Sequence, residues 1–139
     1  MEFNKDCARD ILLYVKQNCC YQDSNFGKRW HDVSFDEICK AEQFSKYEPQ
    51  TISYAIGILL DYCLIKKSDL VFNSNIDEGL KNIHINSLTS RGHEFIDNVS
   101  SDELWDKVKI AIKKANVNDC SLDMYFQYIY NETQKSLNG

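Results

Sequence analysis

The chain is poor in the residues that interrupt regular structure, with one proline and five glycines among 139 residues. This scarcity argues against a long disordered linker, and the length fits one domain. No apolar run approaches the roughly 20 residues that a membrane-spanning helix needs. The N-terminal residues also lack the apolar segment of a secretory signal peptide. We therefore expect a cytoplasmic protein with no membrane segment.

Motifs that carry known chemistry are scarce as well. The sequence has no Gly-rich phosphate loop and no Cys-x-x-Cys pair, and Cys19 and Cys20 are adjacent rather than spaced as zinc ligands. His93 and Glu94 suggest acid–base chemistry, yet no serine or cysteine nucleophile stands beside them in the sequence. We expect these two residues to orient a helix junction, with Gly92 allowing close packing. The sequence therefore predicts no enzyme, no metal site and no cofactor.

Positive charge is in deficit, because 16 lysines and arginines face 21 acidic residues and the net charge is −5. A dedicated nucleic-acid binder usually has the opposite balance, since it must neutralise phosphates. A local basic patch remains compatible with this composition. Of the six cysteines, Cys7, Cys39 and Cys63 fall on predicted apolar helix faces, where cysteine behaves as a small hydrophobe. We expect reduced thiols, as the cytosolic compartment favours.

Hydrophobic periodicity predicts three helices in the first half of the chain. The first covers about residues 5–18. The second begins at a capping box, in which Ser34 caps forward and Glu37 reaches back. The third begins at Pro49, a residue suited to a first helical turn, and its apolar stripe continues through Cys63 and Leu64.

Strand-like segments surround these helices. A polar loop is predicted from Tyr21 to Gly27, followed by a short edge strand over residues 28–33. Residues 64–72 and 82–86 predict a two-stranded hairpin. The order of helix, short strand, two helices and hairpin is that of a winged helix, in which the hairpin is the wing. We therefore predict a mainly α fold with a small β-hairpin.

After the hairpin, the stretch from Leu88 to Phe95 reads Leu-Thr-Ser-Arg-Gly-His-Glu-Phe. Thr89 is the expected N-cap of a helix whose Phe95 and Val99 face a core. A second capping box at Ser100 and a further cap at Ser121 predict two C-terminal helices. The expected organisation is one domain over residues 1–139, with a winged-helix core over residues 1–99 and a helical extension over residues 100–139.

Four stretches together give the chain a family resemblance. They are Asp10-Ile11-Leu12-Leu13, then Leu59 to Ile65, then the Leu-Thr-x-x-Gly-His-Glu-Phe signature of residues 88–95, and finally Trp105 to Lys109. The chain resembles the phage and mobile-element family catalogued as domain-of-unknown-function family 2513. Tyr62-Cys63 replaces that family's usual Ala-Gly, and Ser53 or Tyr54 stands where a histidine is often found. The family's name implies no activity.

The third helix is the candidate DNA reader. Its polar face contains Gln50, whose amide can form hydrogen bonds with adenine. It also contains Thr51 and Ser53, whose hydroxyl groups can contact phosphate. Residues 49–63 contain no lysine or arginine, and Asp61 is their one charge. DNA binding therefore needs a basic surface from neighbouring segments near Gln50 and Thr51. The predicted DNA-binding residues are Gln50, Thr51, Ser53, Tyr54, Lys66, Lys67, Lys81 and Arg91.

The C-terminal helices offer a different surface. Four aromatic residues within six positions, 125–130, cannot all face one side of a helix. Such residues often mark interfaces. We predict self-association as a possible homodimer through an apolar surface formed by Trp105, Val108, Ile112, Tyr125, Phe126 and Ile129. The alternative is that the last helix folds back on its own domain.

Two functions follow from these patterns. The first is a phage- or mobile-element-type winged-helix module that binds duplex DNA weakly, as a transcriptional regulator. The second is an adaptor or inhibitor that binds a host protein and no DNA.

Overall fold

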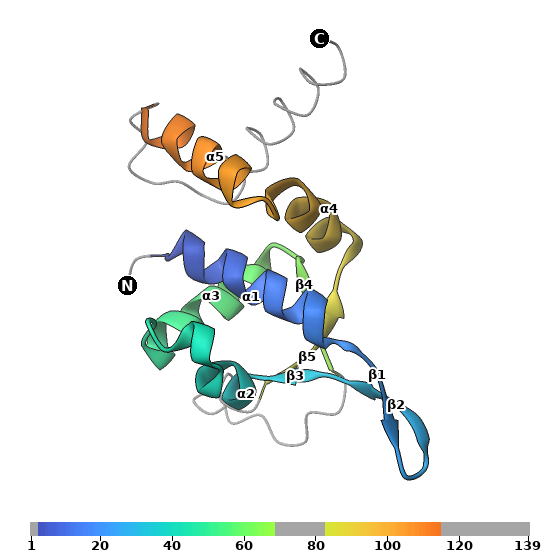
Figure 1. Ribbon diagram of the computed structural model, residues 1–139. Coiled ribbons are helices and arrows are strands. Elements are labelled where there is room, and N and C mark those ends of the chain that lie inside the picture. Colours follow the sequence, from blue (N-terminus) through green and yellow to red (C-terminus); the bar gives the residue numbers. More distant parts are fainter. Residues whose placement is uncertain (1–2, 69–82, 115–139) are drawn as a thin grey trace, which may run out of the picture. The chain divides into compact units, whose positions relative to one another are not determined.

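A computed structural model describes residues 3–68 and 83–114 (Figure 1). The chain divides into two compact units, residues 1–93 and 94–139. The described residues form five α-helices, one 3-10 helix and two small antiparallel sheets. The fold is therefore mixed α and β, with more strand structure than the predicted hairpin and the predicted edge strand over residues 28–33. The division of the predicted domain at residue 99 stays a prediction.

The two long helices of the first unit confirm the helices that hydrophobic periodicity predicts. Helix α1 is Lys5–Asn18, and the side chain of Asn4 caps it by accepting a hydrogen bond from the Cys7 N–H at 2.9 Å. Helix α3 is Pro49–Asp61, with its proline in the first turn. Proline is tolerated there because the first backbone N–H groups of a helix have no partner within it.

Between these helices lie α2 (Phe35–Lys40) and the 3-10 helix η1 (Glu42–Phe44). Ser34 caps α2 as predicted, since its hydroxyl accepts a hydrogen bond from the Glu37 N–H at 3.0 Å. The other half of the predicted capping box is wrong. The Glu37 carboxylate instead accepts a hydrogen bond from the Tyr14 hydroxyl at 2.8 Å and lies 3.0 Å from His31 Nε2. Hydrogen-bond partners outside the helix, Tyr14 and His31, have therefore replaced the predicted contact between the Glu37 side chain and the backbone of Ser34.

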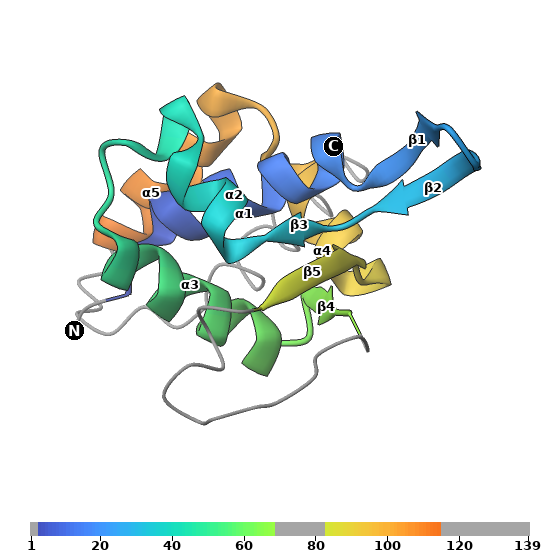
Figure 2. The same ribbon diagram turned by 90° about the horizontal axis from the view of Figure 1, so that it is seen from below.

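A three-stranded antiparallel sheet closes the first unit. Its strands are β3 (Val33–Ser34), β4 (Ile65–Lys67) and β5 (His84–Leu88), in the order β3-β5-β4. Ile65 is paired with Leu88, and Val33 is paired with Ile85. The predicted pairing of a strand after the third helix with a return strand is confirmed, and Figure 2 shows the three strands side by side.

The core of this unit lies where α1 packs against α3 and β5. Each of these elements contributes fully buried aliphatic side chains. Burying one such side chain contributes roughly 1.5–3 kcal/mol, so this small cluster is the main source of stability in the unit. The central members are Ile11, Leu12, Val15, Ile52, Ile56, Leu59 and Ile85.

The predicted polar loop at Tyr21–Gly27 is wrong. Strands β1 (Cys20–Ser24) and β2 (Gly27–His31) form a second antiparallel hairpin there. Gly27 has a φ of +100° at the turn, where glycine is unstrained. Strand residues from Cys20 to Trp30 are exposed on both faces, so the hairpin has none of the alternation that identifies a half-buried strand. We call residues 20–31 the arm.

Helix α3 ends in a Schellman turn. The N–H of Leu64 donates to the Leu59 carbonyl at 2.9 Å, and the N–H of Cys63 donates to the Leu60 carbonyl at 3.0 Å. Cys63 has a φ of +58° and is exposed. Its predicted place on an apolar helix face is wrong, because the helix ends at Asp61, before that face reaches residue 63. The five described cysteines are free thiols.

The start of α4 (Ser90–Val99) is fixed to this turn. Thr89 caps α4 as predicted, accepting a hydrogen bond from the Gly92 N–H at 3.0 Å, and its hydroxyl donates to the Cys63 carbonyl. The Thr89 N–H donates to the Leu64 carbonyl at 3.0 Å. A Cβ atom at residue 92 would overlap that same Leu64 carbonyl oxygen. We call these contacts between residues 62–64 and 89–92 the α3–α4 junction.

The described part of the second unit holds the end of α4 and α5 (Asp102–Lys114). Phe95 and Val99 are buried as predicted. The predicted cap at Ser100 is displaced by one residue, since the Ser101 hydroxyl accepts the hydrogen bond from the Leu104 N–H at 3.4 Å. Ser100 instead donates to the Asp97 carbonyl, because α4 ends immediately before it.

Replacing Cys63 by glycine is expected to stabilise the protein. A non-glycine residue in the left-handed region costs roughly 1–2 kcal/mol, and glycine has no such penalty. We expect a gain of about 1 kcal/mol for Cys63→Gly in urea unfolding, and a loss for Cys63→Val, whose branched side chain is poorly suited to this conformation. Equal stability of the three proteins would contradict the turn geometry.

Replacing Gly92 by alanine is expected to destabilise the protein by about 2 kcal/mol or more, because the added methyl group overlaps backbone and not a movable side chain. Gly57 in α3 is the matched control, since a Cβ atom there meets nothing within 4 Å. Gly57→Ala should raise stability by roughly 0.5–1 kcal/mol through helix propensity. Chemical denaturation of both variants measures the contrast, and effects of the same sign would contradict it.

Candidate nucleic-acid interface

The predicted reading helix, α3, has a polar outer face. Gln50 and Tyr54 are exposed, whereas Thr51 and Ser53 are half-buried. Asp61 lies exposed further along the helix. This face offers hydrogen-bonding groups and one aromatic ring, but its charge is negative. It can contact DNA only where another element supplies cations.

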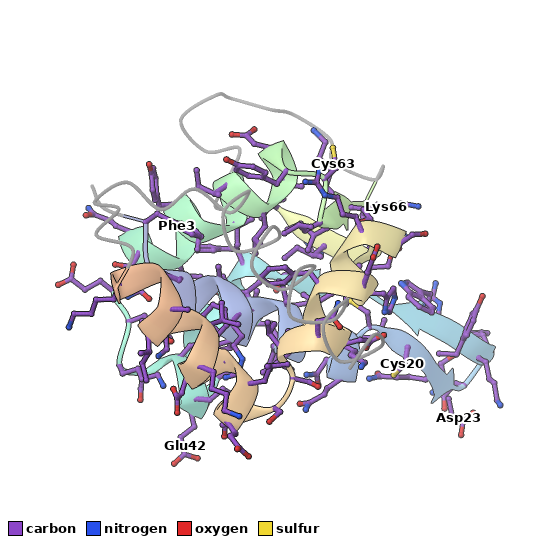
Figure 3. The ribbon with its side chains drawn as sticks, turned by 90° about the horizontal axis from the view of Figure 1, so that it is seen from above. Phe3, Cys20, Asp23, Glu42, Cys63 and Lys66 are labelled. Atoms are coloured by element: carbon purple, nitrogen blue, oxygen red, sulfur yellow. The ribbon has the colours of Figure 1, made fainter. Side chains whose placement is uncertain are left out.

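The cations predicted for that role lie beyond the C-terminal end of α3. Lys66 and Lys67 are exposed on β4, and Figure 3 shows the Lys66 ammonium group pointing away from the ribbon. Arg91 donates to the Tyr62 carbonyl at 3.3 Å, within the α3–α4 junction. Gln50 and Thr51 belong to the opposite end of a helix that is roughly 20 Å long. The structure therefore separates the cations from the residues expected to read bases, and Lys81 lies outside the described residues.

The arm is a surface that sequence reasoning missed. Tyr21 and Trp30 face each other across its strands, with ring centroids 5.0 Å apart and an interplanar angle of 80°. The indole N–H of Trp30 donates to the Asn86 carbonyl on β5 at 2.9 Å. The sequence does contain one signal for this hairpin. It is the Ser-Asn-Phe-Gly turn, in which Gly27 favours a hairpin between two segments of equal length.

Lys28 and Arg29 of the arm make no ion pair with any described residue, and neither do Lys66 and Lys67. The two pairs belong to separate sheets. Lys28 and Arg29 lie on β2 of the arm, which Trp30 ties to β5, whereas Lys66 and Lys67 lie on β4, which pairs with the edge of β5 opposite β3. No described carboxylate forms an ion pair with any of these four cations. We call these four side chains the strand cations.

Two histidine–carboxylate pairs flank β3. His31 lies 3.0 Å from Glu37, and His84 lies 3.3 Å from Asp32. Asp32 also accepts a hydrogen bond from the Ser68 hydroxyl at 2.7 Å. In neither pair is a nucleophile hydrogen-bonded to the imidazole, so the described arrangement orients the base of the arm and lacks the geometry of nucleophilic catalysis.

The side chains of His93 and Glu94 are exposed. The predicted orienting role at the junction belongs to their neighbours, because Thr89 and Arg91 donate to the turn and Gly92 lies against it. For Glu94, helical geometry explains this difference, since it lies two residues, or roughly half a turn, beyond Gly92 and so on the opposite face of the helix. The predicted close packing at Gly92 is confirmed.

The predicted self-association surface is only partly described. Trp105 and Val108 are buried within the single chain. The side chain of Ile112 and residues Tyr125, Phe126 and Ile129 lie outside the described part of the structure. A second copy would reach Trp105 and Val108 only if they were uncovered, and self-association stays a prediction.

Over residues 3–68 and 83–114, no three histidine, cysteine or acidic side chains gather in a way that would hold a metal ion. Within the same ranges, no helix has the length and apolar character needed to cross a membrane.

Comparison with known proteins identifies the family. The chain belongs to the family described as "Hypothetical protein (DUF2513)", whose model matches residues 2–118. It is 31% identical over 123 residues to an "Uncharacterized protein" of Haemophilus influenzae, covering 88% of this chain and 87% of that relative. No solved structure matches. The resemblance inferred from the sequence is thus confirmed, and its phage context stays a prediction.

The raised pKa values belong to groups that hold the first unit together. Burial raises the pKa of the Cys7 thiol to about 12 and that of the Cys19 thiol to about 11. Burial, and then the hydrogen bond to Glu37, raises the pKa of Tyr14 to about 12. Each group is therefore held in its neutral form in the folded protein.

Stability is expected to fall as the pH rises above 9.0, the ordinary pKa of these thiols. The unfolded chain releases their protons from that pH, whereas the folded chain retains them up to the raised values, so unfolding is favoured across this window. Urea midpoints between about pH 8 and pH 11 measure the loss. A Cys7→Ala variant should lose less over the same interval, and parallel curves for the two proteins would contradict the assignment.

Proposed function

We propose that this protein is a winged-helix module that binds duplex DNA as a regulator, and that it is not an enzyme. The strand cations carry the proposal. In a chain with a net charge of −5, four lysine and arginine side chains on β2 and β4 have no ion-pair partner among the described residues. Such side chains are available to neutralise phosphates.

The topology supports the winged-helix part of the proposal. Helices α2 and α3 are joined through η1 in the manner of a helix-turn-helix, and β4 and β5 follow as an antiparallel pair. The short strand β3 joins the other edge of β5, so that the first strand and the wing form one sheet. In this arrangement α3 is the reading helix, and β4 places Lys66 and Lys67 beside its C-terminal end.

The charge distribution supports weak binding governed by salt. The outer face of α3 contributes hydrogen-bonding groups at Gln50 and Tyr54 but has a negative charge at Asp61. Affinity must therefore come mainly from the strand cations and from Arg91, through phosphate contacts that depend little on sequence. A module of this kind needs low salt, or a second contact, to bind tightly.

A titration of fluorescent random-sequence duplexes tests the proposal. We expect binding at about 50 mM salt that weakens steeply as salt is added. A Lys66→Gln/Lys67→Gln double variant should bind more weakly and reduce the salt slope by about two, one for each phosphate contact that is removed. Anisotropy measured over a series of salt concentrations gives both quantities.

The matched control is Lys40→Gln/Lys107→Gln, which removes the same charge from two lysines that pair with Asp36 and Glu103 within their own helices. That variant should bind as the wild type does. If the wild type binds no duplex even at low salt, the DNA-binding proposal is wrong, and the adaptor function becomes the one to test. Equal weakening of both double variants would mean that net charge, and not the strand cations, governs binding.

A further inference from the structure

The arm projects from the first unit as a two-stranded ribbon, with its tip far from the sheet at its base (Figures 1 and 2). Figure 3 places Cys20 at the base of the arm and Asp23 near its tip. All strand residues of the arm are exposed except His31, which is half-buried. Because most of the hairpin is exposed, it contributes little to the hydrophobic core. Its own stability must therefore come from contacts within the arm and at its base.

Three contacts hold the ribbon in shape. Tyr21 and Trp30 form an edge-to-face pair across the strands. The Trp30 indole ties the base of the arm to β5 through the Asn86 carbonyl. At the tip, the Ser24 hydroxyl donates to the Gly27 carbonyl at 2.6 Å and accepts from the Phe26 N–H at 3.3 Å. An isolated hairpin is marginal in water, and these contacts pre-order this one at little entropic cost on binding.

Phe26 stands at the extreme end of the turn and is 91% exposed. No aromatic ring contact fixes it among the described residues. A large aromatic ring this exposed on a pre-ordered turn is a candidate contact point for a partner.

The arm has a cation on each of its two faces. In the observed register Lys28 is paired with Asp23, on the same face as Tyr21 and Trp30, whereas Arg29 is paired with Gln22 on the opposite face. A ligand that lies on one side of the ribbon would leave one cation unused. A groove bounded by phosphates on both sides uses both.

We propose that the arm enters a groove of duplex DNA, where Lys28 and Arg29 contact the two flanking phosphate backbones and Phe26 wedges between base pairs at the tip. A two-stranded ribbon can enter either groove of DNA, and the minor groove is the one from which apolar side chains are wedged between base steps. Apolar side chains such as phenylalanine are inserted between base steps by proteins that kink DNA. This inference rests on the proposed DNA binding and adds to it a second contact, distinct from α3 and β4.

Charge complementarity favours DNA over a protein as the occupant. The arm contains two cations and one anion, whereas the chain as a whole has a net charge of −5. Its two cations have no ion-pair partner among the described residues. Its exposed aromatic residues also suit a protein hot spot, and the experiment below treats that occupant as an outcome that overturns the inference.

The test uses the full chain and the same random-sequence duplexes. Phe26→Ala is expected to weaken binding about tenfold while leaving the salt slope unchanged, because stacking releases no counterions. Lys28→Gln/Arg29→Gln is expected to reduce the salt slope by about two. In duplexes that contain the fluorescent base aminopurine at successive positions, the wild type should raise the emission by unstacking, and Phe26→Ala should lose that rise.

Ile110→Ala is the matched control for the ring, since Ile110 of α5 is likewise an exposed apolar side chain, with 54% exposure. Lys40→Gln/Lys107→Gln is again the control for charge. Both controls should behave as the wild type. If the wild type binds duplex and the arm variants bind equally well, the arm does not contact DNA and its aromatic residues serve a protein partner. If the wild type binds no duplex, the proposed function itself has failed.

Discussion

The α3–α4 junction is the constraint on which the rest of the first unit depends. Thr89 both caps α4 and donates to the turn that ends α3, while Gly92 lets the two backbones meet at the Leu64 carbonyl. These contacts fix where β5 ends relative to β4. The register of the three-stranded sheet, and with it the position of Lys66 and the anchor of the arm, follows from a few backbone hydrogen bonds.

The net charge of the chain is negative, whereas the strand cations carry positive charge that no described ion pair neutralises. The acidic residues outnumber the basic ones, and Lys40, Lys107 and Lys109 each pair with an acidic residue of their own helix. The strand cations have no such partners among the described residues. These side chains can therefore attract phosphate while the chain as a whole repels it, which suits binding that is weak and sensitive to salt.

The arm shows how an exposed hairpin can escape a prediction based on hydrophobic periodicity. Its residues are exposed on both faces, so no alternation of polar and apolar side chains marks the strands. Its stability comes from the Tyr21–Trp30 pair and from the indole contact to Asn86, a residue 56 positions away along the chain. Only a folded chain reveals that these partners exist.

The sequence by itself determined helices α1 to α5, the pairing of β4 with β5, the cap at Thr89 and the family, whereas the helix predicted from Ser121 lies outside the described residues. These depend on local periodicity and capping, which neighbouring residues encode directly. Tertiary structure alone decided that Glu37 binds Tyr14 instead of closing its capping box, that Cys63 leaves the helix face in a left-handed turn, and that residues 20–31 form an arm. The first two outcomes depend on a partner distant in sequence or on where a helix is forced to end. For the arm, the Ser-Asn-Phe-Gly turn was a local signal, but the contacts that hold it to β5 are distant in sequence.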